Sequence, residues 1–357
     1  MAPPETSPSG STAASLARAV ARWGVAGALA ALTFELVLRP IYSIHMASDP
    51  ELGAIVAPGS TVRWGIEGWG TSRWAARGIR VEAADPSRPS VLVLGDSQTE
   101  SLMVDDAEVF TTLAERRLQK AKPAARVLNA GKSSHSVADY VALAPRYQAA
   151  FAPKWVVVQV RDSDFGSDAF HENKRHFERT ASGVAVVDVP EPTRGRLGSL
   201  AWAARQRSSL FGYSVVRFGK FRAAAAQDAP LFHASQAKHD EAPTGEAAEL
   251  ASEFPLDAEL DLLVKAWDGR VTILYLPELD PKHPDRVSSI GGWLAARCRS
   301  QGVSFVTLAD AFGGMLARGR SPYGFANTHF NEGHMNAEGQ AATADLLAAE
   351  LERLGVP

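Results

Sequence analysis

The sequence predicts a three-layer α/β fold, in which a parallel sheet of five strands is covered by helices on both faces. Short runs rich in Val, Ile and Leu alternate with longer amphipathic segments after residue 90. These runs are apolar throughout, as expected of strands that are buried on both faces. Repeated alternation of strand and helix is typical of a parallel sheet. The predicted strands are 91–95, 126–131, 154–160, 271–276 and 303–308.

Composition indicates a folded protein and excludes some partners. The 357 residues are 46% hydrophobic and 22% charged, which is a balance typical of chains that form a core. The formal charge is -3, so the global balance does not favour nucleic acid as a partner. The single cysteine, Cys298, allows no intramolecular disulfide and no cysteine-based zinc site.

The N-terminal region predicts a flexible tail at 1–15 and a membrane anchor at 16–46. The apolar run Trp23–Leu38 is broken only by Glu35. About sixteen helical residues span about 24 Å, which is short of the roughly 30 Å hydrocarbon core, so the residues after Pro40 are expected to help the helix reach the interface. A cleaved signal peptide and a helix of a soluble protein are the alternatives. Arginines at 18 and 22 favour a cytoplasmic N-terminus and an extracytoplasmic domain.

A lead-in at 47–89 connects this anchor to the main domain, 90–357. Its tryptophans at 64, 69 and 74 match neither a helical nor a strand period, and packing against the main domain is favoured over a sugar-binding or membrane-interface role. Within the main domain, helices are expected at 105–121, 138–152 and 337–354. An insertion at about 166–252 carries a possible hairpin and a helix. Its length suits a lid over the active site.

The motif Gly95-Asp96-Ser97 follows the first strand directly and precedes a helix. In a parallel sheet, ligands bind at the carboxyl ends of the strands. Ser97 is therefore a candidate nucleophile, and its own N–H could stabilise an oxyanion. The alternative is that Asp96 or Ser97 only caps the following helix.

Two further residues fit a serine mechanism. His334 lies in a loop before the predicted C-terminal helix and is the natural base for Ser97. Gly131 ends the second strand, where a backbone N–H could approach a substrate oxygen without a side chain in the way.

These ordered blocks resemble the SGNH/GDSL hydrolase superfamily, specifically its bacterial members with an N-terminal membrane anchor. The resemblance runs from about Val91 to the C-terminus and implies a flavodoxin-like sheet. It also implies Ser97 as nucleophile, Gly131 as oxyanion donor and His334 as base. Asn336 and Gly339 fit the residues that follow the family histidine.

Two departures from the family pattern concern the third and last blocks. Ser163, or else Asp162, stands where an asparagine donor is expected, and the hydroxyl is the better donor. Asn331 stands where the family has the triad aspartate. An amide can orient an imidazole but cannot stabilise its positive charge. A Ser–His dyad, or a different carboxylate such as Glu332 or Asp310, are the alternatives, and inactivity is a further one.

The sequence thus predicts a membrane-anchored serine esterase that acts outside the cytoplasm on a small-molecule or glycan ester. No metal or organic cofactor is expected to take part. An O-acyltransferase that acts on cell-surface polysaccharide would use the same residues. A scaffold or binding protein that keeps the fold and has lost the chemistry is the non-enzymatic alternative.

Overall fold

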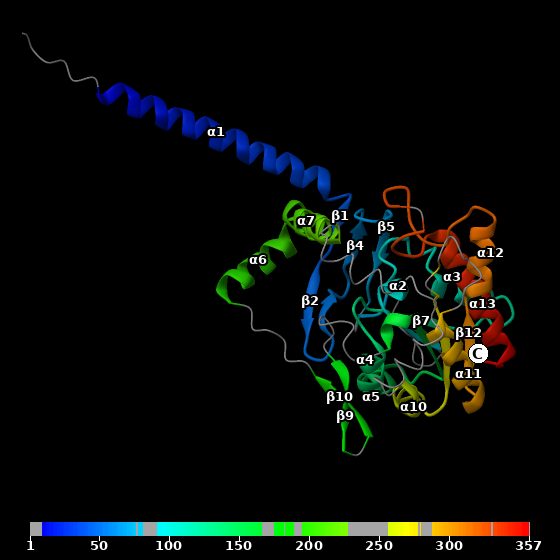
Figure 1. Cartoon of the computed structure of the whole chain (residues 1–357). Helices are drawn as coiled ribbons and strands as arrows, with labels where there is room; N and C mark the ends of the chain where they lie inside the picture. Colours follow the sequence, from blue (N-terminus) through cyan, green and yellow to red (C-terminus); the bar gives the residue numbers. More distant parts are fainter. Residues whose placement is uncertain are drawn as a thin grey trace, which may run out of the picture.

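The computed structural model describes residues 9–75, 78–80, 91–165, 175–181, 183–188, 195–227, 256–277, 279, 288–329 and 331–356. A long helix, α1, extends away from a body in which helices surround a central sheet (Figure 1). The C-terminus lies on this body, on the side opposite to α1.

The central sheet confirms the predicted fold class. Its order is β12-β11-β8-β6-β7, and every pairing within it is parallel. This is the predicted flavodoxin-like order, in which the first strand along the chain lies between the second and the third. The strands are β6 (Val91–Leu94), β7 (Val127–Asn129), β8 (Trp155–Val160), β11 (Val271–Tyr275) and β12 (Ser304–Thr307).

Two hydrophobic cores, one on each face of the sheet, complete the three layers. Successive residues of β6 point to opposite faces, so Leu92 and Leu94 belong to one core while Val91 and Val93 belong to the other. The first core is covered by α4 (Val137–Ala142), α5 (Ala144–Phe151), α10 (Leu256–Ala266) and α11 (Ser289–Gln301). The second is covered by α3 (Phe110–Leu118), α12 (Ala309–Ala317) and α13 (Ala337–Arg353).

The lead-in folds into two small antiparallel sheets that pack on the main domain. One sheet has the order β1-β4-β5, and β2 pairs with β3 in the other. A third apolar cluster joins Val62 and Trp74 of the lead-in to Leu102 and Met103, which follow the Gly-Asp-Ser block. The strands are β1 (Tyr42–Ser43), β2 (Met46–Asp49), β3 (Gly53–Val56), β4 (Thr61–Trp64) and β5 (Gly70–Arg73).

The helix α1 (Ser9–Leu38) begins inside the predicted tail and ends before the residues that were expected to extend the anchor. Its segment Ala14–Leu38 has 25 residues and is long and apolar enough to cross a membrane. At 1.5 Å per residue this segment spans about 37 Å. The additional length comes from the N-terminal side, because residues 39–41 form a turn and Tyr42 already belongs to β1.

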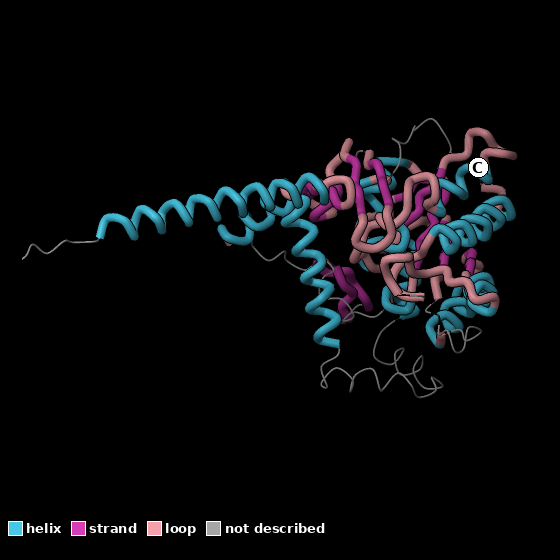
Figure 2. The backbone as a smooth tube through the Cα atoms, turned by 90° about the horizontal axis from the view of Figure 1, so that it is seen from above, coloured by secondary structure: helices cyan, strands magenta, loops and turns pink. Residues whose placement is uncertain are grey.

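The insertion forms a hairpin and two helices among its described residues. The hairpin, β9 (Arg175–Thr180) and β10 (Gly183–Asp188), confirms the expected one. In place of the single expected helix there are two, α6 (Arg196–Arg207) and α7 (Ser209–Gln227). α7 packs against α1 and β1, and α6 packs on α7, so this part of the insertion does not form the expected lid (Figures 1 and 2). The polar stretch 236–249 lies outside the described residues.

Candidate active site

Ser97 begins α2 (Ser97–Glu100), a single helical turn that follows β6 directly. Asp96 is the N-cap residue, and its Oδ1 accepts a hydrogen bond of 2.8 Å from Gln98 N. The capping role that sequence considered for either residue therefore belongs to Asp96, and the Ser97 hydroxyl is available for another partner.

That partner is His334. The distance between His334 Nε2 and Ser97 Oγ is 2.9 Å. Gln98 holds the histidine loop from both sides, because its Nε2 donates to Gly333 O at 3.1 Å and its Oε1 accepts from Met335 N at 2.9 Å. The residue next to Ser97 thus fixes the loop that carries its base.

A carboxylate of the lead-in completes the chain of hydrogen bonds. Glu67 Oε2 lies 2.9 Å from His334 Nδ1, and Glu67 Oε1 accepts from His334 N at 2.7 Å. Glu67 is only 3% exposed, so water competes little for these contacts. Since Nδ1 faces a carboxylate, Nε2 is the nitrogen left to exchange a proton with Ser97.

Local backbone requirements explain how Glu67 approaches the histidine. Glu67 lies in the loop between β4 and β5, where Gly68 has a φ of +65° and donates from its N to Asn327 Oδ1 at 2.9 Å. Gly333 has a φ of +82°, and a Cβ there would overlap Glu67 Oε1. Both glycines are therefore required by the geometry of the contact.

Asn331, the predicted triad position, lies elsewhere. Its Oδ1 accepts from Ser321 Oγ at 3.0 Å, and its Nδ2 donates to Leu279 O at 3.4 Å. Its backbone has a φ of +59°, a conformation that asparagine tolerates better than most residues. The side chain thus fastens the loop. The alternative carboxylates, Glu332 and Asp310, are exposed, whereas Glu67 occupies the position beside Nδ1.

The predicted oxyanion donors differ in availability. Ser97 is the first residue of α2, and an N–H in the first turn of a helix has no partner within that helix. Gly131 N donates to Asn129 Oδ1 at 2.9 Å, and a Cβ at Gly131 would overlap Thr99 and Glu100 of α2. The glycine thus lets β7 and α2 pack closely, while its N–H already has an acceptor.

Ser163 lies in the short 3₁₀ helix η2 (Asp162–Asp164), directly after β8. Among the described residues its hydroxyl has no hydrogen-bond partner, so it can donate to a ligand. Asp162, the other residue considered for this position, accepts at its Oδ1 from Tyr275 Oη at 2.6 Å and from Ser288 Oγ at 2.9 Å.

Two buried carboxyl groups interact beside the serine: Asp96, which precedes Ser97, and Asp164 of η2. Burial raises the pKa of Asp96, and Arg161, with Nη1 at 3.9 Å from Asp96 Oδ2, opposes the rise. Burial and the charge of Asp96 raise the pKa of Asp164 well above its ordinary value. Two such groups share a site best when one is protonated, which reduces the negative charge near a developing oxyanion.

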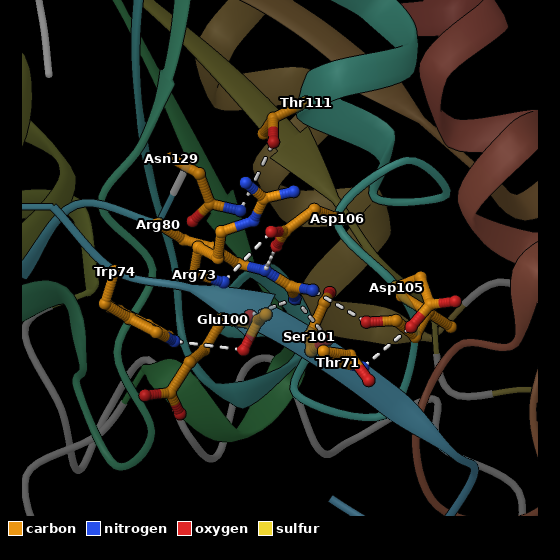
Figure 3. A network of polar contacts seen from close by, with 12 residues as sticks. Thr71, Arg73, Trp74, Arg80, Glu100, Ser101, Asp105, Asp106, Thr111 and Asn129 are labelled. Carbon is orange, nitrogen blue, oxygen red and sulfur yellow. Dashed lines mark hydrogen bonds and ion pairs between the residues drawn. The ribbon is translucent and has the colours of Figure 1, made fainter. Parts of the chain in front are cut away.

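A buried arginine fixes the lead-in to the serine block (Figure 3). The Arg80 side chain has no exposed surface, and its Nε donates to Asp106 Oδ1 at 2.9 Å. Its Nη atoms donate to the carbonyl groups of Glu100, Ser101 and Val104. Asp106 Oδ2 in turn accepts from Arg73 N of β5 at 2.9 Å. Glu67 lies in the hairpin of β4 and β5, which we call the Glu67 hairpin. The network therefore holds one strand of this hairpin, β5, and the segment that follows Ser97 against Arg80 and Asp106.

Sequence reasoning missed Glu67. One signal was available. Glu67 is the single charged residue in the run Gly65-Ile66-Glu67-Gly68-Trp69-Gly70, and a carboxylate among apolar and glycine residues is unusual on a solvated face. Within the described residues, no cluster of three or more His, Cys, Asp or Glu side chains could hold a metal ion.

Comparison with solved structures gives similarities of fold at low sequence identity. The structure of TesA is 16% identical, with a TM-score of 0.39, over 74% of this chain and 99% of that chain. A catalytic mutant of Axe2, an acetylxylan esterase from Geobacillus stearothermophilus, is 14% identical, with a TM-score of 0.41, over 76% of this chain and 96% of that chain. The lipase/acylhydrolase from Enterococcus faecalis is 11% identical, with a TM-score of 0.40, over 74% and 96%. No protein-family model and no curated protein matches the sequence.

Proposed function

We propose that the chain is a serine esterase of the SGNH type, with Ser97 as nucleophile, His334 as general base and Glu67 as the carboxylate that orients and stabilises the histidine. The observation that carries this proposal is the unbroken chain of hydrogen bonds from Ser97 Oγ through the imidazole to Glu67. Nucleophile, base and orienting group in this order make up the constellation that activates a serine.

The proposed reaction has two steps. Ser97 Oγ attacks the carbonyl carbon of the ester while its proton passes to His334 Nε2. The imidazolium then gives this proton to the departing alkoxide, which leaves an acyl-serine and a free alcohol. Water, deprotonated by the same nitrogen, attacks the acyl group and releases the carboxylic acid and the serine hydroxyl. Glu67 stabilises the imidazolium in both steps.

The tetrahedral intermediate requires donors for its oxyanion. The Ser97 N–H and the Ser163 hydroxyl are the donors we assign, because neither is engaged by an acceptor among the described residues. Gly131 N–H is also a candidate, although a substrate oxygen must compete there with Asn129 Oδ1.

Glu67 weakens the argument for a scaffold protein. That alternative was motivated by an amide at the position of the triad acid, and the lead-in supplies a carboxylate to the same histidine nitrogen. An O-acyltransferase would share the first step and differ in the acceptor. Release of free acid, measured with and without an added sugar alcohol, distinguishes water from a hydroxyl acceptor.

The direct test is covalent labelling of the full chain in detergent with a fluorophosphonate, together with hydrolysis of a short-chain chromogenic ester. The wild type is expected to label at Ser97 and to hydrolyse the ester. Ser97→Ala is expected to lose both properties, and His334→Ala to lose hydrolysis. A folded wild type that neither labels nor hydrolyses would contradict the assignment.

We also propose that α1 anchors the chain with the catalytic domain outside the cytoplasm. The length and composition of Ala14–Leu38 and the arginines at 18 and 22 support this topology. Protease added to sealed spheroplasts should degrade the catalytic domain. If the domain is cut only after the membrane is permeabilised, it lies in the cytoplasm and the proposed topology is wrong.

A further inference from the structure

A basic cavity of about 280 Å³ lies where α1 meets the catalytic domain. The end of α1, the strand β1 and the turn between α6 and α7 form its walls. Its lining includes Arg39, Arg63, Arg205 and Arg207, and no Asp or Glu among the described residues. None of the residues in the hydrogen-bonded chain at Ser97 lines it, so the cavity is separate from the proposed active site.

Most of these positive charges have no carboxylate partner in the described parts of the chain. Glu35, the nearest acidic residue in sequence, accepts from Arg39 Nε at 3.2 Å. Its oxygens also accept from the backbone N of Ser209 at 3.0 Å and of Leu210 at 2.9 Å. Glu35 is thus engaged in joining α1 to α7. The other three arginines lack an ion-pair partner among the described residues, and an anion between them would offset their mutual repulsion.

Gln206 lines the cavity beside these arginines. Gln206 Oε1 accepts from Met46 N at 2.6 Å, whereas Gln206 Nε2 is buried and has no acceptor among the described residues. The cavity donors are therefore the guanidinium groups, which are suited to a tetrahedral oxyanion such as a phosphate group.

The position of the cavity identifies where such a phosphate comes from. Arg39 directly follows α1, so the cavity lies at the level where this helix leaves the hydrocarbon core and headgroups begin. In Figure 1, α7 lies at the end of α1, and α6 leads away from α7 at an angle to α1. The helices expose large apolar side chains at Leu197, Leu200 and Phe218.

Charge in the same two helices favours an anionic surface. The segment 195–227 contains one lysine, at 220, and five arginines, at 196, 205, 207, 217 and 222, and no Asp or Glu. Amphipathic helices that combine exposed apolar side chains with basic ones lie at membrane interfaces and are attracted to anionic lipids.

We propose that this cavity binds the phosphate group of an anionic lipid headgroup, while α6 and α7 lie against the surrounding bilayer. Arg205 and Arg207 hold the phosphate from one wall. The proposal requires α1 to be in a membrane. It does not require the esterase activity.

The test is a titration of the detergent-solubilised full chain with short-chain phosphatidylglycerol or phosphatidylcholine, with bound lipid counted by native mass spectrometry. We expect the wild type to retain one phosphatidylglycerol in preference to phosphatidylcholine. The variant Arg205→Gln/Arg207→Gln should bind about 30-fold more weakly, as the loss of two interfacial charges predicts. The matched control is Arg299→Gln/Arg318→Gln, which removes two exposed arginines of the catalytic domain and should bind like the wild type.

Ester hydrolysis by each variant serves as a check of folding, because none of these arginines belongs to the proposed active site. Equal binding of the two lipids by the wild type, or equal weakening by both double variants, would overturn the proposal. Inorganic phosphate and glycerol phosphate form a separate arm. If they raise the melting temperature of the wild type while no lipid is retained, the cavity takes a free phosphate and the lipid assignment is wrong.

Discussion

Gly333 lies between the carboxylate and the imidazole of the proposed site. Its φ of +82° orients the backbone so that His334 N can donate to Glu67 Oε1, and the absence of a Cβ leaves room for that oxygen. A residue without a side chain is therefore as necessary to the geometry as the charged groups.

Gly333→Ala should lower kcat for ester hydrolysis by about tenfold or more, because the methyl group displaces Glu67 and even a displacement of about 1 Å in an active site can be costly. Gly319→Ala is the matched control. Gly319 also has a left-handed φ of +71°, but a Cβ there has no neighbour within 4 Å. It should destabilise the protein by about 1 kcal/mol through backbone strain and leave kcat unchanged. Equal kcat values for the two variants would contradict this role of Gly333.

Sequence could predict Ser97 and His334 because each follows a recognisable block, at the end of a strand or before a helix. It could not predict Glu67. The contact between Glu67 and His334 joins residues 267 positions apart, and no local pattern specifies which hairpin loop meets which histidine. The family spacing points to Asn331, but a spacing carries no information about the tertiary partner of His334 Nδ1.

At the scale of elements, the buried Arg80 joins two segments that belong to different parts of the chain. Desolvation lowers the pKa of its guanidinium, and the Asp106 carboxylate opposes that effect. Because this carboxylate also accepts from Arg73 N of β5, the ion pair links the Glu67 hairpin to the segment that follows Ser97.

Asp106→Asn should destabilise the protein by about 3 kcal/mol in urea unfolding, because it removes the carboxylate that is hydrogen-bonded to a buried guanidinium and leaves only the more remote charges of Glu100 and Asp105. Asp105→Asn is the control. Asp105 acts on Arg80 only through space, and its Oδ1 accepts from Thr71 N at 2.7 Å, an acceptor that asparagine keeps, so the loss should be clearly smaller than that of Asp106→Asn. A similar loss in both variants would mean that the charge of Asp106 contributes nothing specific.

Elements were predictable where periodicity and length agreed. The five central strands are apolar throughout, and each was found within two residues of its predicted bounds. The predicted helix at 138–152 is divided into α4 and α5 at Leu143, because Pro145 lies in the first turn of α5 and cannot donate a hydrogen bond to the preceding turn. In the insertion the hairpin and helical segments were predictable, but their places were not, because α7 is positioned by its contacts with α1 and β1 and α6 by its contacts with α7.

At the scale of the whole molecule, an ion pair fastens the lead-in to the helical layer. Arg146 of α5 donates from Nη2 to Asp49 Oδ2 at 2.6 Å and from Nη1 to Asp49 Oδ1 at 2.7 Å. The hydrogen bond with Arg146 is the main cause that lowers the pKa of Asp49 from 3.8 to about 2, against the opposing effect of burial.

This pair predicts a pH-dependent contribution to stability. Since the folded-state pKa lies below the unfolded-state value, the contribution is present above pH 3.8 and is lost as the pH falls through about 2. Asp49→Asn should therefore lower the free energy of unfolding by about 1–2 kcal/mol at pH 7, and the difference should shrink below about pH 4.

Urea unfolding of both proteins from pH 7 down to the acid limit of the native state measures this difference. Asp268→Asn is the control, because Asp268 forms an exposed pair with Arg270 and should contribute little. A difference between wild type and Asp49→Asn that stays constant over the whole range would show that the charge of Asp49 is not its cause.

The central claim is that Glu67 supports a Ser97–His334 esterase, and the most direct measurement is kcat for ester hydrolysis by Glu67→Gln beside Asn331→Ala. Glutamine keeps the size of the side chain and removes its charge. The account predicts that kcat of Glu67→Gln falls by about 10³–10⁴ with little change in KM, while Asn331→Ala stays within about tenfold of the wild type. A Glu67→Gln enzyme with nearly wild-type kcat, beside an Asn331→Ala enzyme that has lost its activity, would contradict it.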